Sequence, residues 1–358
     1  MGRLFHAPKR GSRQFLKPNK KANSMGQLKI IGNTEQLTPR RVFFTLYGHG
    51  GVYKTTLSFS AKQKVLLFDF DRGIARADQT FRSDYAPMDN FDDFYSYVMD
   101  GYLETDVKEK GYQTVVLDTI GTMLDDHAAP WLISQDASNG NGQGGLSLRG
   151  WGNLKTLFGM IRNKFVSLNL GIVAICHAKE DGEGNNRSID IAVSGGTSDI
   201  INRACDMMGY MYPRGDKMYI DFRRTQEHAG KTIIDWAPEV LPAKGSPEIK
   251  TYLSDIEDRC MAKMMQQSAA AVSAMQLVGD LKGRIEACTT KEDLDLLNDE
   301  IGAVKSKTIK TQISAAYRDK LKELGYEYNK ETKEWELKPD PSPLDGMKEK
   351  ETLFAESK

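Results

Sequence analysis

The chain has 358 residues, with 49 Lys and Arg against 49 Asp and Glu and 40% apolar residues, enough for one large domain or for a core with a smaller attachment. A charged fraction of 27%, and no apolar run approaching the roughly 18–20 residues that a spanning helix needs, exclude a helical membrane protein. Four cysteines without a CxxC pair argue against a disulfide scaffold and against a structural zinc site. With no apolar signal-peptide core at its start, we expect a reducing, cytoplasmic location.

The first 40 residues are strongly basic. Residues 1–34 carry eight Lys or Arg and no acid, so we expect a flexible arm over 1–40 that cannot fold alone. One interpretation is contact with nucleic-acid phosphates, and a solvated tail is equally consistent. A mitochondrial presequence would also be basic, but the Pro, Gly and Asn content argues against its amphipathic helix. The candidate DNA-binding residues of the arm are Lys9, Arg10, Arg13, Lys20 and Lys21.

Four continuous apolar runs predict buried strands, and a run without polar alternation is typical of a parallel sheet covered on both faces. These strands are expected at 41–47, 65–71, 114–119 and 171–177. Apolar residues at helical spacing lie between them, over 91–102 and 151–165. The alternation predicts an α/β core with a mainly parallel, doubly wound sheet over residues 41–250.

The part of the chain after this alternation changes character. Three shorter β-like runs suit a hairpin-like extension of the sheet, at 209–212, 218–222 and 232–236. Residues 254–325 are expected to form a helical attachment, in which a capping box at Thr289–Glu292 opens a helix running to Val304 and a second helix ends at Gly325. Residues 326–358 are expected to form a short hairpin, over 326–337, and a polar tail.

A glycine-rich loop directly after the first strand is the strongest chemical signal. The loop is GHGGVYKTT, comprising Gly48, His49, Gly50, Gly51, Val52, Tyr53, Lys54, Thr55 and Thr56. It follows the GxxxxGK[ST] phosphate-loop template between a strand and a helix, whose backbone N–H groups and helix N-terminus attract anions. We expect Lys54 to contact the β- and γ-phosphates and the Thr55 hydroxyl to hold Mg²⁺. Tyr53 stands where the template has glycine, so its ring must point away from the phosphates if the loop is to stay closed.

Polar residues end the neighbouring strands. Asp118 follows TVVL, Asp69 and Asp71 end the second strand, and His177 ends the fourth. Because parallel strands place their carboxyl ends at one edge of the sheet, these side chains are expected to converge with the loop. Asp118 would hold Mg²⁺, and an acid after the second strand would activate water. Each aspartate alone is equally typical of a turn or a helix cap, and His177 alone of a strand-end histidine.

The order of strand, GHGGVYKTT, VLLFDFD, VVLDTIGTM and GIVAICHAK resembles that of RecA-like P-loop ATPases, part of the AAA-type ATPases. It looks most similar to phage and bacterial ATP-binding proteins of the single-strand-annealing recombinase type, over about residues 41–236. The resemblance implies ATP and Mg²⁺ as ligands, Asp118 beside the metal, Asp71 as the catalytic acid with Asp69 nearby, and His177 as the γ-phosphate sensor. A phage-encoded protein would act in the host cytoplasm.

The same resemblance implies contacts outside the pocket. Two DNA-facing loops would correspond to 134–150 and 178–197, and basic residues reaching a neighbouring subunit's nucleotide would match Arg223, Arg224 or Lys231, for which a solvated strand face is nearly as consistent. The second loop is rich in acids, so DNA binding is expected to rest on the basic arm, on Arg149 or on the lysines of 305–310, or to be absent. Single-stranded DNA, further copies in a ring or filament, and a replication or recombination protein are the expected partners.

Two other functions fit parts of the sequence. HGGVYKTT is similar to the deviant phosphate loop of partition and septum-site ATPases, with His49 at their signature lysine, although only eight residues separate Thr56 from Val65 and leave a short helix. The other alternative is a nucleotide-binding module in which Tyr53 limits turnover and the helical region recruits a replication partner. DNA-stimulated hydrolysis separates these alternatives from a Mg²⁺-dependent ATPase acting on single-stranded DNA.

Overall fold

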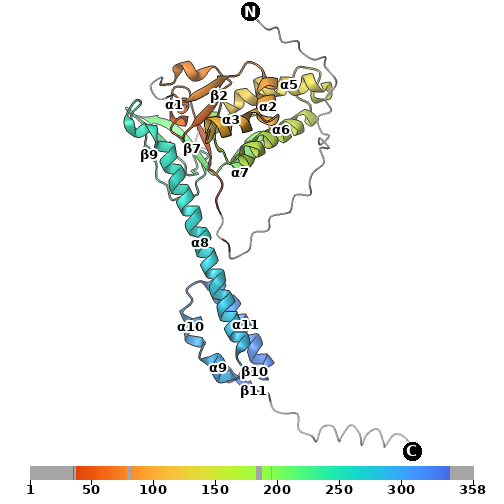
Figure 1. Ribbon diagram of the computed structural model, residues 1–358, viewed down its shortest axis with the longest axis vertical. Coiled ribbons are helices and arrows are strands. Elements are labelled where there is room, and N and C mark those ends of the chain that lie inside the picture. Colours follow the sequence, from red (N-terminus) through yellow and green to blue (C-terminus); the bar gives the residue numbers. More distant parts are fainter. Residues whose placement is uncertain (1–34, 36–37, 79–81, 183–187, 195, 339–358) are drawn as a thin grey trace, which may run out of the picture. The chain divides into compact units, whose positions relative to one another are not determined.

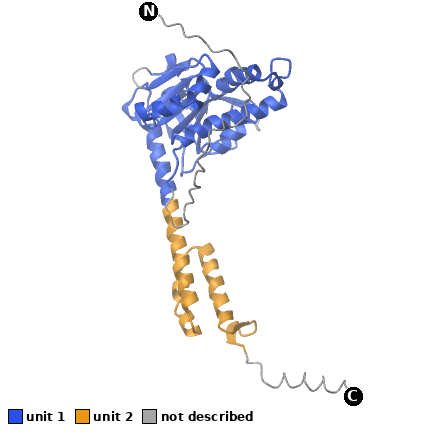
Figure 2. Ribbon diagram, turned by 45° about the vertical axis from the view of Figure 1, so that its right-hand side comes forward, with its two compact units in different colours: residues 1–27, 38–266 blue, residues 28–37, 267–358 orange. Residues whose placement is uncertain are grey.

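The computed structural model describes Glu35 and residues 38–78, 82–182, 188–194 and 196–338 (Figure 1). The chain divides into a first unit, residues 1–27 and 38–266, and a second unit, residues 28–37 and 267–358 (Figure 2). The five candidate DNA-binding residues of the basic arm lie outside the described residues. Among the described helices, none combines the length and the apolar character needed to span a bilayer.

A nine-stranded sheet forms the centre of the first unit. Its strands are β1 (Phe43–Gly48), β2 (Val65–Asp69), β3 (Asp84–Pro87), β4 (Thr114–Asp118), β5 (Gly171–Asp181), β6 (Ser188–Ile191), β7 (Met207–Arg214), β8 (Lys217–Asp221) and β9 (Glu239–Val240). The order is β3-β2-β4-β5-β1-β7-β8-β9, and β6 pairs with β5. All neighbours from β3 to β7 are parallel, whereas β8, β9 and β6 join antiparallel. The sheet is therefore mainly parallel, as expected.

Helices cover both faces of this sheet, which explains why its central strands are apolar throughout. The helices of the first unit are α1 (Lys54–Ser58), α2 (Phe91–Met99), α3 (Tyr102–Lys110), α4 (Ile120–Thr122), α5 (Ala129–Gln135), α6 (Leu148–Ser167), α7 (Thr197–Ala204) and the first part of α8 (Tyr252–Ala287). One apolar cluster joins strand residues to α2, α3, α5 and α6, which Figure 1 shows grouped together, and a second joins the opposite strand residues to α1 and α8. The fold class is the predicted one, an α/β core with a mainly parallel sheet covered by helices on both faces.

Two strand predictions differ from the structure. β3 was not predicted, because its four residues alternate between half-buried and exposed positions at the edge of the sheet. The strand prediction at 232–236 is wrong, because these residues form no strand in the structure. The strand that pairs with β8 on this side is β9. The Thr232 hydroxyl donates to the carbonyl oxygen of Ile234 and accepts from its N–H, so a local turn replaces the strand hydrogen bonds.

The second unit has its own core. It contains the end of α8, then α9 (Lys291–Asp295), α10 (Asn298–Ala303), α11 (Lys307–Glu323) and a hairpin of β10 (Tyr326–Asn329) and β11 (Glu334–Leu337). Leu281, Leu294 and Ile313 are among its buried residues. The capping box lies one residue later than predicted, with Thr290 as N-cap and Asp293 as its partner. The single helix expected to follow it is two short helices, α9 and α10.

Candidate nucleotide-binding site

The glycine loop between β1 and α1 has the backbone that its sequence predicts. Gly48 ends β1 against β7, where an added Cβ would lie 2.4 Å from the carbonyl oxygen of Met211, so only glycine fits. Gly51 has a φ of +83°, a conformation that glycine adopts without strain. Val52 is buried and anchors the loop, whereas the residues from His49 to Gly51 are exposed. The middle of the loop is thus exposed, while Gly48 and Val52 at its two ends are buried.

Tyr53 occupies the template's second glycine position and adopts a backbone conformation that favours glycine there. Its φ of 44° and ψ of 39° lie in the left-handed region, which glycine enters more easily than other residues. The phenol hydroxyl donates to the carbonyl oxygen of Pro242 at 3.3 Å, and the half-buried side chain packs against the apolar cluster beneath α8. The hydroxyl end of the ring is therefore directed away from the loop, as a closed loop requires.

Lys54 opens α1 and is almost fully buried. Its Nζ donates to the carbonyl oxygens of Gly48 and His49, each at 2.9 Å. Burial lowers the pKa of Lys54, while the neighbouring carboxylate of Asp118 raises it. The ammonium group is thus held against the loop itself, the position from which a lysine contacts bound phosphate.

Thr55 and Asp118, the two residues expected at Mg²⁺, are in direct contact. The Thr55 hydroxyl donates to Oδ2 of Asp118 at 2.6 Å. Asp118 ends β4 with 1% of its surface exposed, and burial raises its pKa to about 7 against the opposing effect of the Thr55 hydrogen bond. In the sheet, β5 separates β4 from β1, so this contact joins β4 to the helix that follows a strand two places away.

Three carboxylates meet beside this pair. Asp69, Asp71 and Asp118 each offer an oxygen atom within 4.8 Å of the others. Asp69 is fully buried and accepts the N–H groups of Gly73 at 2.9 Å and Ile74 at 3.2 Å, so it fixes the turn after β2. Asp71 also accepts the N–H of Gly73, but its side chain is 20% exposed and lines the cavity. The two aspartates therefore differ: Asp69 holds the backbone and Asp71 faces the ligand space.

The donor atoms of this cluster fit Mg²⁺. Carboxylate and hydroxyl oxygens are the hard ligands that this cation takes in proteins, and Thr55 and Asp118 present them in direct contact, with the Asp71 carboxylate nearby. Burial raises the pKa of Asp118 most, and the charges of Asp71 and Asp69 raise it further, whereas the Thr55 hydrogen bond lowers it. A divalent cation would offset that repulsion, so the residues match the metal that the sequence predicts.

The cavity in front of these groups has a volume of about 370 Å³. Its lining comprises Gly50, Gly51, Val52, Tyr53, Lys54, Thr55, Thr56, Asp71, Gly73, Arg76, Ala77, Asp118, Thr119, His177 and Lys244. His177 pairs with Gly48 in the sheet register and reaches this cavity as predicted, and burial lowers its pKa, followed by the charge of Lys54. The predicted loop, metal pair, acid and sensor thus surround one space.

Two cations of the lining were not predicted. Arg76 lies in the 3-10 turn after β2, 3.9 Å from Asp71, and Lys244 follows β9. Neither lies in a recognisable motif, and only the tertiary fold brings them beside Lys54. Both add positive charge where a triphosphate would lie.

Other predicted residues lie elsewhere. His49 is absent from the cavity lining, and its Nε2 lies 3.4 Å from Glu180 in β5. Arg223 donates two hydrogen bonds to Asp221, while Lys231 donates to the carbonyl oxygens of Asn202 and Arg203 in the last turn of α7. These two residues and the exposed Arg224 are likewise outside the lining.

The two expected DNA-facing loops are more ordered than predicted. The segment at 178–197 is not a simple loop, because residues 178–181 of β5 pair with β6. In 134–150 an isolated bridge joins Gly140 to Leu146, and Ser147 caps α6. Arg149 lies in the first turn of α6 and forms an ion pair with Asp136.

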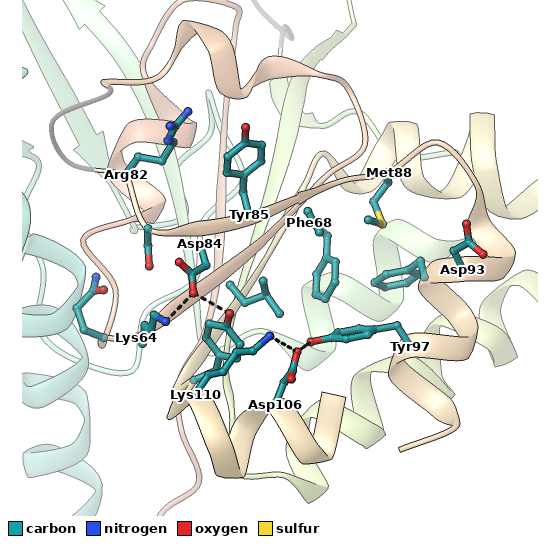
Figure 3. Close-up of a pocket in the computed structure, with 16 residues that line it drawn as sticks. Lys64, Phe68, Arg82, Asp84, Tyr85, Met88, Asp93, Tyr97, Asp106 and Lys110 are labelled. Atoms are coloured by element: carbon teal, nitrogen blue, oxygen red, sulfur yellow. Dashed lines mark hydrogen bonds and ion pairs between the residues drawn. The ribbon is translucent and has the colours of Figure 1, made fainter. Parts of the chain in front are cut away.

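A larger cleft, of about 1070 Å³, lies at the β3 edge of the sheet (Figure 3). Two of its three acids are already paired: Asp84 accepts from Tyr112 and forms an ion pair with Lys64, and Asp106 accepts from Lys110 and Tyr97. The third acid, Asp93, lies on α2. None of the phosphate-loop residues lines it. We therefore place the candidate site in the smaller cavity, where the charged groups converge on open space.

Comparisons with known proteins give one family match and several similar solved structures. A family model described as an AAA domain matches residues 40–233. Among solved structures, a KaiC-like protein from the hyperthermophilic archaeon Pyrococcus horikoshii is similar, with 14% identity and a TM-score of 0.35 over 57% of this chain and 86% of that one. The RadB recombinase is similar with 15% identity and a TM-score of 0.30, over 51% of this chain and 80% of that one. No curated protein sequence matches the chain.

Proposed function

Because the chain belongs to the AAA domain family of ATP-binding P-loop proteins, we propose that it is a Mg²⁺-dependent ATPase that acts on single-stranded DNA in recombination or replication. The observation that carries the ATPase part is the hydrogen bond of 2.6 Å between Thr55 and Asp118, made beside Lys54 and Asp71. It joins the phosphate loop to the metal-binding acid at the mouth of one cavity. A simple glycine turn before a helix would not require that contact.

The proposed chemistry is attack of water on the γ-phosphate of ATP. Loop N–H groups and the Lys54 ammonium hold the phosphates, and Asp71 orients the water and accepts its proton. His177, whose pKa is lowered by burial, is placed to donate a hydrogen bond to the γ-phosphate as a neutral imidazole. Bound Mg²⁺ would neutralise charge on the phosphate oxygens. The protein's contribution is mainly positioning and electrostatic stabilisation.

We propose that the nucleotide state is coupled to holding single strands, with the basic arm adding phosphate contacts and further copies of the chain assembling in a ring or filament. The AAA domain match favours this function over a partition-type ATPase. The short α1, which ends at Ser58, favours it as well. His49, which stands at the signature lysine of the partition-type loop, lies beside Glu180 and outside the phosphate pocket.

The test is ATP hydrolysis measured with Mg²⁺ against oligothymidylates of increasing length. We expect hydrolysis to rise with DNA length, and Asp71→Asn to bind ATP as tightly as the wild type while its kcat falls about 100-fold or more, the range for loss of a general base. Asp93→Asn, which alters an exposed acid of α2, is the control and should hydrolyse normally. Unchanged kcat in Asp71→Asn would remove its assignment. ATP binding without turnover at any DNA length would instead favour the nucleotide-binding module.

A further inference from the structure

A row of stacked tyrosines lies on one face of the antiparallel end of the sheet, apart from the nucleotide cavity. Alternation along β7 places Tyr210 and Tyr212 on the same face, and Tyr219 of β8 lies opposite Tyr212 in the register. The rings of Tyr210 and Tyr212 are 5.2 Å apart with 17° between their planes, and those of Tyr212 and Tyr219 are 5.7 Å apart with the same angle. The planes of neighbouring rings in this row are therefore nearly parallel, along β7 and across to β8.

The outer part of this stack is accessible. Tyr210 is 8% exposed, but Tyr212 and Tyr219 are only half-buried, and Val240 of β9, which is opposite Tyr219, is 46% exposed. Tyr219 and Val240 belong to none of the three apolar clusters formed by the described residues. Tyr212, by contrast, packs against the first cluster. Tyr212, Tyr219 and Val240 thus make an apolar strip across three strands, called the tyrosine strip below, that the described side chains cover only in part.

Cations border the strip on both sides. Arg214 and Lys217 form the next register pair towards the turn, both are exposed, and no described carboxylate forms an ion pair with either. On the other side, Arg223 makes two hydrogen bonds to the buried Asp221, so that acid is neutralised. Burial and Asp221 raise the pKa of Tyr212, while the charges of Arg214 and Arg223 lower it, as expected when both guanidinium groups lie near its ring.

Flat rings beside unpaired cations are the elements of a single-strand binding surface. Unpaired bases stack on aromatic rings whatever their sequence, and Arg and Lys track the phosphates. Residues two apart along a strand are about 7 Å apart, a separation that one nucleotide spans between its base and its phosphate. A duplex keeps its bases stacked inside and offers no ring to Tyr212 or Tyr219.

We propose that the tyrosine strip binds single-stranded nucleic acid, with bases stacked on Tyr212 and Tyr219 and phosphates held by Arg214 and Lys217. The inference rests on the proposed function, since it names the surface on which the single strand lies. It differs from the sequence-based expectation, in which DNA binding rests on the basic arm, on Arg149 or on the lysines of 305–310, or is absent. It also assigns a function to the antiparallel strands β7 and β8, which take no part in the nucleotide cavity.

The first experiment measures the affinity of the full-length chain for a fluorescent oligothymidylate by anisotropy. We expect Tyr212→Ala and Tyr219→Ala each to weaken binding about tenfold, within the range measured for loss of one base–aromatic stack. Tyr219→Phe keeps the ring and should bind like the wild type. Changing Arg214 and Lys217 together to Gln should lower the slope of log affinity against log salt by about 1.4, since each phosphate contact on a single strand contributes about 0.7.

Tyr102→Ala is the matched control, because Tyr102 is an exposed tyrosine of α3 with 64% of its surface accessible. It should leave affinity unchanged, and thermal unfolding should confirm that every variant is folded. A second readout is photocross-linking with an oligonucleotide containing 5-iodouracil, followed by mass spectrometry. We expect the cross-link on Tyr212 or Tyr219.

Folded Tyr212→Ala and Tyr219→Ala variants that bind the oligonucleotide like the wild type, with cross-links elsewhere, would overturn the strip while leaving the proposed ATPase intact. If these variants change the sedimentation of the protein but not its DNA affinity, the strip is an interface between copies of the chain and the inference is wrong. A wild-type protein that hydrolyses ATP but binds no oligonucleotide contradicts both the strip and the single-strand part of the proposed function. A wild-type protein that binds the oligonucleotide but no ATP contradicts only the nucleotide site.

Discussion

Tyr53 is the residue at which this phosphate loop departs from its template. A non-glycine residue in the left-handed region costs roughly 1–2 kcal/mol, and here φ is 44°. The hydrogen bond to Pro242 and the packing of the half-buried ring contribute about as much in the opposite direction, because a net intramolecular hydrogen bond is worth about 1 kcal/mol. The side chain therefore stabilises a loop shape that glycine would adopt unaided.

This balance gives a prediction for Tyr53→Gly. We expect ATP affinity and kcat within about threefold of the wild type, since glycine keeps the same backbone conformation and the phenol hydroxyl bonds Pro242 rather than the loop. Tyr53→Phe, which keeps the ring and removes only that hydrogen bond, is the comparison. A large rise in kcat for the glycine variant alone would mean that the ring restricts the site and would contradict this orientation.

The sequence located much of the site at this scale. Lys54, Thr55 and Asp118 are predicted from a motif and from strand ends, and the structure brings them together at one cavity. The separate positions of Asp69 and Asp71 were not predictable, because only the turn at Gly73 decides which carboxylate the backbone occupies. Arg76 reaches the cavity through tertiary structure alone.

At the scale of elements, α8 is fixed to the first unit by its initial turns. Leu253, Ile256 and Cys260 are buried against the sheet, and Glu257, with 2% exposure, lies 3.4 Å from Arg41 just before β1. Burial raises the pKa of Glu257, and the charge of Arg41 lowers it. The pair thus joins the start of the helix to the start of the central strand.

Removing one partner of this pair should be costly. We expect Glu257→Ala to lower the free energy of unfolding by about 2–4 kcal/mol, because Arg41 would keep a largely buried charge without a counter-ion. Asp258→Ala, next along the same helix, breaks an exposed pair with Lys62 and should cost under about 1 kcal/mol. The measurement is the midpoint of urea unfolding for each variant. Equal midpoints for the two variants would show that the buried pair stabilises the fold no more than the exposed pair does.

Element predictions succeeded where local pattern and burial agree. The four apolar runs became β1, β2, β4 and β5 because strands buried on both faces need continuous apolar residues. β3 was missed, since a four-residue edge strand carries little pattern. The run at 232–236 was mistaken for a strand, because Thr232 closes a turn on its own backbone.

At the scale of the whole first unit, one sheet edge collects residues distant in sequence. The glycine loop and Asp71 follow β1 and β2, and Asp118 ends β4. His177 lies within β5, which continues beyond the predicted strand end to Asp181, at the level of Gly48. These groups share one edge because the strands are parallel. That convergence was predictable from the sequence. The strand order was not, since it depends on how helices of different size pack on each face, and neither was the tyrosine strip, which needs the register of β7, β8 and β9.

The most direct test of the nucleotide site is calorimetric titration of Mg²⁺-ATP into the wild type and Lys54→Ala, with Lys62→Ala as a control lysine outside the cavity. We expect one site per chain in the wild type and in Lys62→Ala, and an affinity at least about 100-fold weaker in Lys54→Ala, because the charge-assisted contacts to phosphate are lost. Equal affinity in Lys54→Ala and the wild type would contradict a phosphate-binding role for this loop.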